Sequence, residues 1–311
     1  LDEDGGVHAD LTISRLGSDS YRVVTGGADG NRDWVTLRNY RDDNGLNADI
    51  NIRTHDIATI GLWGPKAANA LGNFIDPNDI DIKNFPFVTA KNLTLNLSGE
   101  KKVDVWAARI SYVGESGWEI YFNNDKDDGL ALYDSLLEVG VIPVGIETYA
   151  NSRRLEKSFR LQGADLETEY TAIEAAIQRP LVKEADFHGK AAHLSQREED
   201  PCAILCTMTL DDLNVSGKTR YPVGISPIID PATGEVPIDS KGRRSYTTGM
   251  SYCPSLKKFV VMGYLPKEIA IQGKSLLIEY FNEDGDGLYP MTVQIVGKGS
   301  LYDPSNERVR A

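Results

Sequence analysis

Residues 109–122 read RISYVGESGWEIYF, a stretch in which two glycines stand three positions apart between aromatic residues. Gly114 and Gly117 flank two residues, and this spacing predicts a two-residue turn between antiparallel strands. In the register that such a turn imposes, Tyr112 lies opposite Glu119, with their Cβ atoms about 5 Å apart on one side of the sheet. The sequence therefore predicts a hairpin that pairs a phenol with a carboxylate.

The returning strand of this hairpin has an apolar and a polar side. Trp118, Ile120 and Phe122 alternate with Glu119 and Tyr121, and alternate residues of a strand point to opposite faces. A carboxylate beside an aromatic ring can accept two parallel hydrogen bonds from a flat nitrogen heterocycle. The same alternation also fits a polar face that only contacts solvent, so the pattern alone leaves both interpretations open.

The order of predicted strands and helices up to residue 161 favours an α+β fold. Helical spacing of apolar residues after Pro65 predicts a helix that follows a strand directly. Strands are predicted at 5–16, 21–27, 57–63, 85–90, 92–97 and 101–112, and helices at 65–75, 127–139 and 147–161.

From Pro201 onward the pattern changes to strands separated by glycine and proline turns. This predicts an all-β, barrel-like domain at the C-terminal end. The polar stretch SQREED at 195–200 marks the predicted boundary, which divides the chain into domains 1–196 and 197–311.

Composition and charge exclude several classes of partner. The formal net charge of -13 opposes binding to nucleic acid and to anionic membrane surfaces, because both need a basic surface. No apolar run reaches a membrane-spanning length, and the start LDEDGG lacks the features of a signal peptide. We therefore expect a cytoplasmic protein, or one of the mitochondrial matrix if the source is eukaryotic. The four histidines show no metal-binding spacing, so no metal site is predicted.

Asp10 is a lone carboxylate in the stretch GGVHADLTISRL. If this stretch is a strand, Asp10 shares a face with His8 and Thr12, next to a Gly-Gly turn. These polar groups fit a reactive site, and they fit equally well the outward face of an edge strand.

Seven stretches, in order, resemble the folate-binding aminomethyltransferase family, which includes the T-protein of glycine cleavage and the C-terminal halves of dimethylglycine and sarcosine oxidoreductases. They are GGVHADLTISRL, IGLWGPKA, ISYVGESGWEIYF, NSRRLEKSFRLQGADLETEY, IEAAI, DFHGKAA and TTGMSYCPSLKKFVVMGYLP. The fourth stretch is closer to the oxidoreductase branch, because T-proteins usually carry an arginine where Tyr149 or Ala150 stands here.

The resemblance implies a role for five residues. Asp10 matches the catalytic aspartate, although Ala9 replaces the second acidic residue that T-proteins often have beside it. Glu119 would accept hydrogen bonds from the pterin ring of tetrahydrofolate, and Tyr112 would pack beside that ring. Thr12 and Tyr252 would be further folate contacts.

The resemblance also implies a ring-like aminomethyltransferase fold whose first part is missing from this sequence. We therefore expect the chain to be part of something longer, with the remainder of the fold cleaved off or supplied by another chain.

Three functions are consistent with the resemblance. In the first, a flavoprotein domain or subunit carrying FAD oxidises an N-methyl amine, and this module captures the carbon as 5,10-methylenetetrahydrofolate. The second is an aminomethyltransferase of the T-protein type, or a flavin-independent folate-dependent demethylase. The third is a non-catalytic folate-binding relative with a role in assembly or regulation.

Overall fold

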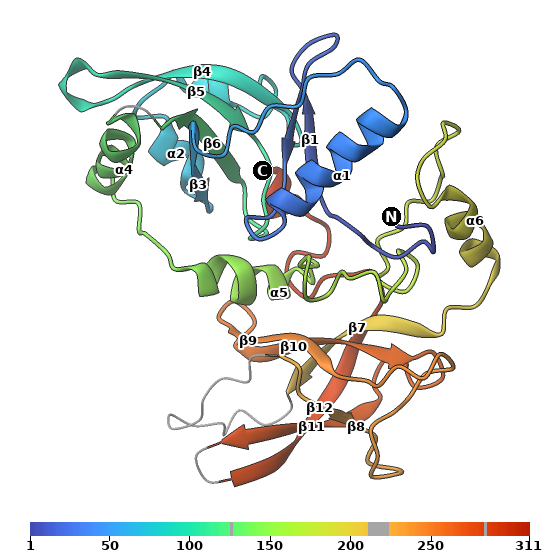
Figure 1. The fold of residues 1–311 in the computed structure, drawn as a ribbon. Helices are drawn as coiled ribbons and strands as arrows, with labels where there is room; N and C mark the ends of the chain where they lie inside the picture. Colours follow the sequence, from blue (N-terminus) through green and yellow to red (C-terminus); the bar gives the residue numbers. More distant parts are fainter. Residues whose placement is uncertain (125–126, 211–223, 283–284) are drawn as a thin grey trace. The chain divides into compact units, whose positions relative to one another are not determined.

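The computed structural model describes residues 1–124, 127–210, 224–282 and 285–311 (Figure 1). These residues form two compact units. The first unit contains residues 1–10 and 146–304, and the second contains residues 11–145 and 305–311. The mixture of helices and antiparallel sheets in these units confirms the predicted α+β class.

The boundaries of the two compact units differ from those of the predicted domains. Residues 146–196, which we assigned to the N-terminal domain, fall in the first unit together with the larger sheet. All strands of that sheet come after residue 197, as the pattern of the C-terminal segment indicated. The division into domains 1–196 and 197–311 stays a prediction.

The second unit is built on a four-stranded antiparallel sheet with the order β3-β6-β5-β4. Its strands are β3 (Ile57–Trp63), β4 (Ala90–Asn96), β5 (Lys102–Ala108) and β6 (Gly117–Asn123). Trp118, Ile120 and Phe122 of β6 are buried in one hydrophobic cluster, so the predicted apolar side of this strand is correct.

Helices cover the apolar face of this sheet. Leu132 and Leu136 of α4 (Asp128–Glu138) and Leu71 of α2 (Ala67–Leu71) belong to the same cluster as Trp118. The other face of the sheet, with Glu119 and Tyr121, is therefore left for the site described below. Shorter elements of this unit are α3 (Pro77–Ile80), η1 (Ser98–Glu100) and α7 (Glu307–Arg310).

A two-stranded hairpin and a helix complete the second unit. The hairpin consists of β1 (Thr12–Arg15) and β2 (Tyr21–Val24), and helix α1 (Gly30–Asp43) follows. The predicted strand at 5–16 is thus too long, because residues 7–11 have no regular secondary structure. Within the first unit, the Val7 amide instead donates to the Tyr170 carbonyl, and Gly6 forms a β-bridge with Thr171. This segment therefore pairs with residues 170–171 and does not extend strand β1.

The first unit contains a six-stranded antiparallel sheet with the order β8-β11-β12-β7-β10-β9. The strands are β7 (Ala203–Leu210), β8 (Ile228–Ile229), β9 (Thr247–Cys253), β10 (Lys258–Pro266), β11 (Ser275–Asn282) and β12 (Gly285–Val296). Alternate residues of β10 belong to two different hydrophobic clusters. Val261 is part of one cluster, and Val260 and Met262 are part of the other. Burial on both faces explains why this strand reads as a continuous apolar run.

The predicted helix at 147–161 is shorter in the structure. A π-helical segment η2 (Glu147–Arg153) continues into α5 (Arg154–Glu156). The helix ends there because Ser158 has a positive φ of 53° and the Arg160 guanidinium donates to the Ala175 carbonyl at 2.9 Å. Helix α6 (Lys190–Glu198) precedes the larger sheet. Within the described residues, no helix is long and apolar enough to cross a membrane.

Candidate functional site

The predicted register of the 109–122 hairpin is wrong. Strand β5 ends at Ala108, and Ala108 rather than Tyr112 is the cross-strand partner of Glu119. Residues 109–116 form a longer connection in place of the predicted two-residue turn. Tyr112 lies in this connection and is half-buried.

Arg109 explains why the strand stops where it does. Its backbone amide donates to the Thr89 carbonyl at 2.9 Å, and its side chain is only 3% exposed. The guanidinium Nη1 donates to the carbonyls of Ile80 at 3.0 Å and Phe85 at 2.9 Å. These bonds hold Arg109 against the segment before β4, where turns replace the strand predicted at 85–90.

Glu119 and Tyr121 lie on the same face of β6, as predicted. The Tyr121 hydroxyl donates to the Glu119 carboxylate, which fixes the orientation of the acid. Burial raises the pKa of Glu119 above its ordinary value, and the hydrogen bond from Tyr121 offsets part of this effect. The carboxylate is half-buried, so it remains open to a ligand while losing part of its hydration.

A tryptophan lies next to this carboxylate. Gly61 of β3 is the cross-strand partner of Glu119 on the side away from Ala108. The Trp63 indole lies over Gly61, since a Cβ at this position would come within 2.0 Å of the ring. Its Nε1 donates to the Ile110 carbonyl at 2.9 Å. The surroundings of Glu119 therefore combine small residues with a flat aromatic wall.

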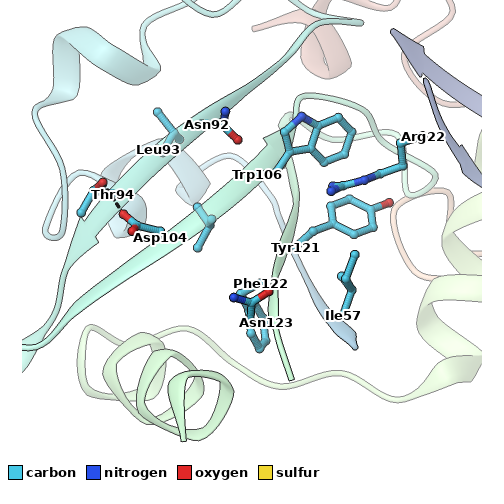
Figure 2. A pocket seen from close by; sticks show the side chains of 11 residues that line it. Arg22, Ile57, Asn92, Leu93, Thr94, Asp104, Trp106, Tyr121, Phe122 and Asn123 are labelled. Atoms are coloured by element: carbon cyan, nitrogen blue, oxygen red, sulfur yellow. Dashed lines mark hydrogen bonds between the residues drawn. The ribbon is translucent and has the colours of Figure 1, made fainter. Parts of the chain in front are cut away.

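Tyr121 also belongs to an aromatic stack that the sequence did not reveal. Its ring meets the Trp106 indole at a steep angle, with the centroids 5.1 Å apart. The Arg22 guanidinium lies 4.2 Å from the centroid of the indole and 5.5 Å from that of the phenol. Figure 2 shows the guanidinium close to both rings.

A cavity of about 440 Å³ adjoins this stack within the second unit (Figure 2). It is lined by residues of β2 to β6, namely Arg22, Ile57, Asn92, Leu93, Thr94, Asp104, Val105, Trp106, Tyr121, Phe122 and Asn123. The alternation of KKVDVWAARISY places Trp106 and Asp104 on one face of a strand. This pattern is the feature of the sequence from which part of the cavity lining could have been predicted. Arg22 gave no signal, because it comes from a separate hairpin.

The remaining predicted site residues are divided between the units. Thr12 begins β1 and is exposed, whereas Tyr252 in β9 of the first unit packs edge-on against Phe259 at 5.4 Å. Asp10, also of the first unit, lies outside any strand and is exposed. The protein around Asp10 still removes part of its hydration and raises the pKa of its carboxyl. Its predicted face-sharing with His8 and Thr12 in a strand is therefore wrong.

Comparison with known proteins identifies the type of chain that these features belong to. The sequence profile of the family described as the GCVT N-terminal domain matches residues 1–184. The mitochondrial dimethylglycine dehydrogenase of Homo sapiens is 27% identical over 314 residues, which cover 98% of this chain and 33% of that protein. An aminomethyltransferase of Symbiobacterium thermophilum is 29% identical over 290 residues, covering 88% of this chain and 71% of that protein.

A solved structure has the same fold. The glycine cleavage system aminomethyltransferase T from Bartonella henselae superposes with a TM-score of 0.74 at 22% identity, covering 95% of this chain and 73% of that one. The chain spans only about a third of the length of the dimethylglycine dehydrogenases that it matches.

Proposed function

Because the chain belongs to the family of the GCVT N-terminal domain, we propose that it binds tetrahydrofolate and attaches a one-carbon unit to it. More specifically, we propose that it is the one-carbon transfer module of an oxidoreductase that demethylates an N-methyl amine of the dimethylglycine or sarcosine type. The match of 98% of the chain to part of a dimethylglycine dehydrogenase supports this assignment.

The observation that carries the proposal is the environment of Glu119. A half-buried carboxylate, oriented by the Tyr121 hydroxyl and flanked by the Trp63 indole, suits the paired N–H groups of a pterin. Both flat faces of such a ring favour contact with aromatic side chains. Tyr112 and Thr12, from the same unit, are proposed as further contacts.

Asp10 is proposed as the residue that handles the proton. Reduced folate supplies the two amines that take up the carbon of an iminium, and this uptake gives the demethylated amine and one proton. The negative charge of the Asp10 carboxylate first stabilises the cationic intermediate, and the carboxylate then accepts the proton that is released when the methylene bridge closes. Tyr252 is proposed as a folate contact from the C-terminal sheet.

The iminium has to be formed elsewhere. We propose that FAD on a fused or partner flavoprotein domain oxidises the N-methyl amine and delivers the product to this module. The difference in length between the chain and the dimethylglycine dehydrogenases is consistent with such a domain.

An aminomethyltransferase of the T-protein type is the alternative, as is a flavin-independent demethylase. The bacterial aminomethyltransferase relative supports it, because the chain covers 71% of that protein. The two functions differ in the donor: the first requires a flavoprotein, and the T-protein requires a lipoyl carrier.

Calorimetric titration of the full chain with 5-formyltetrahydrofolate tests the common premise. We expect binding by the wild type, and binding about 10- to 100-fold weaker by Glu119→Gln, since the substitution removes a charge-assisted hydrogen bond. Glu138→Gln, on the exposed part of α4, serves as a control and should bind like the wild type. Absence of any binding to the wild type would exclude the proposed function.

A further inference from the structure

Arg22 occupies an unusual position for a cation. It is half-buried in β2, and its guanidinium is held against Trp106 and Tyr121 at the distances given above. Stacking on aromatic rings holds the planar group in one place and leaves its edges free for hydrogen bonds.

One edge of this guanidinium, on the side of Nη1, is buried. Among the residues that the structure describes, none accepts a hydrogen bond from the buried Nη1 of Arg22. Loss of hydration lowers the pKa of Arg22; Tyr121 offsets part of this effect, and the nearby Arg53 adds to it. A buried charged donor without a partner is costly, and native proteins rarely leave one unsatisfied. An anionic ligand would remove this cost.

The rest of the cavity indicates the charge of that ligand. Asn92 and Asn123 lie on the lining and can donate hydrogen bonds through their amide groups. Asp104 also lines the cavity and accepts a hydrogen bond from Thr94 at 2.6 Å. A carboxylate in the wall repels a dianion such as phosphate more strongly than a monoanion, so the lining favours a single negative charge.

Part of the cavity lining, which includes Trp106, Tyr121 and Asn123, lies on the same sheet face as Glu119. Tyr121 contacts both, through its ring on the Arg22 side and its hydroxyl on the Glu119 side. From Glu119 to Asn123 the strand advances by about 13 Å, so a ligand held at Glu119 by a ring can reach the cavity with an extended tail.

We propose that this cavity is a carboxylate-binding site in which Arg22 is the anchoring residue. The carboxylate belongs either to the glutamate tail of the folate, which rests on the function proposed above, or to a small free carboxylic acid such as an N-methylated glycine. Both sources present the same group to the same guanidinium.

Three variants of the full chain isolate the contribution of Arg22. Arg22→Met keeps a stem that packs on the rings and removes the donors, whereas Arg22→Lys keeps the charge and loses the planar fork. Arg38→Met is the matched control, because Arg38 stacks on Trp34 at 4.7 Å outside the cavity. Each protein is titrated with 5-formyltetrahydrofolate, with 5-formyltetrahydropteroate, which lacks the glutamate, and with dimethylglycine.

If the folate tail is the source, removing the glutamate should weaken binding to the wild type and to Arg38→Met by about 10- to 100-fold. Arg22→Met should then bind both pterins equally weakly, and Arg22→Lys should recover part of the loss. If a free acid is the source, dimethylglycine should bind to the wild type and to Arg38→Met but not to Arg22→Met.

The inference is overturned if Arg22→Met binds all three ligands with wild-type affinity, or if neither folate nor dimethylglycine binds to the wild type. Failure of the proposed function gives a different result. In that case no pterin binds to any variant, while Arg22-dependent binding of dimethylglycine still supports the carboxylate site.

Discussion

At the scale of single residues, the proposed chemistry depends on two carboxylates in different settings. Glu119 is oriented by the Tyr121 hydroxyl and is half-buried, which suits a group that holds a ring in place. Asp10 is exposed and has no strand around it, which suits a group that exchanges a proton. Substitutions at the two positions should therefore have different consequences.

Asp10→Asn should slow the formation of 5,10-methylenetetrahydrofolate by about 10²- to 10⁴-fold, the usual contribution of a general base. The affinity for 5-formyltetrahydrofolate should change little, because Asp10 is proposed to act on the proton and not to hold the pterin. Stopped assays of the product and calorimetry of the ligand measure the two quantities separately. Unchanged turnover in the variant would show that another group takes the proton.

Glu119 should make the stability of the second unit depend on pH. Its raised pKa means that the folded protein keeps a proton which the unfolded chain has already released. The free energy of unfolding therefore falls as pH rises from the ordinary glutamate pKa of about 4.3 through the higher folded value. Glu119→Gln removes this contribution, so the variant should gain stability relative to the wild type across that window.

Urea denaturation between pH 4 and pH 8 measures this difference. All four tryptophans of the chain, at positions 34, 63, 106 and 118, lie in the second unit. Their fluorescence therefore reports the unfolding of that unit. A difference between variant and wild type that is the same at every pH would contradict the prediction.

At the scale of elements, non-local contacts decide where strands end. The alternation in β6 predicted its buried side correctly, because period-two patterning is a local property. The same stretch did not predict the end of β5, since that depends on hydrogen bonds from Arg109 to the distant carbonyls of Ile80 and Phe85. The stack of Arg22 on Trp106 likewise joins separate strands, and no single window of sequence contains it.

Gly61→Ala should disturb the wall beside Glu119. The new Cβ would overlap the Trp63 ring, and moving that ring would break its hydrogen bond to Ile110. We expect a loss of about 1 to 3 kcal/mol in the unfolding free energy of the second unit, measured by urea denaturation. Gly27→Ala is the control, because a Cβ there meets no atom within 4 Å; equal losses in both variants would contradict the packing argument.

The first unit depends on a buried ion pair between Arg154 and Asp165, which are 1% and 0% exposed. Asp165 also accepts hydrogen bonds from Thr248 and from the Leu161 amide. Asp165→Asn should destabilise this unit by about 3 to 5 kcal/mol, because it leaves the charge of the buried Arg154 guanidinium without a counter-charge.

Hydrogen exchange of residues 146–304 measures this effect, since the unit lacks tryptophan. Asp200→Asn removes a pair with Lys267 in which the acid is 84% exposed, and it should cost about 1 kcal/mol or less. Similar losses in the two variants would show that burial does not set the strength of the pair.

At the scale of the whole molecule, membership of the family followed from the order of several weak motifs, and the α+β class followed from the order of predicted strands and helices; both are confirmed. The assignment of individual residues to the site stays a prediction, because long-range contacts position their side chains and no single window of sequence contains those contacts.

Mass spectrometry of the native assembly, combined with an absorbance spectrum, should reveal a flavoprotein domain or subunit together with this chain. This outcome is expected from the function proposed above, and the match of the chain to 33% of the human dimethylglycine dehydrogenase is consistent with it. A native assembly without flavin, whose activity requires a lipoyl carrier, would instead favour the aminomethyltransferase alternative.

Tyr121 has one further consequence, because a single side chain supports both the guanidinium and the acid. A ligand that draws Arg22 off the phenol changes the freedom of that ring, and with it the direction in which the acid points. Occupancy at either end then alters affinity at the other by the same factor, as thermodynamic reciprocity requires. Ligand binding at Glu119 and ligand binding at Arg22 would then be thermodynamically coupled, and Tyr121→Phe would remove this coupling.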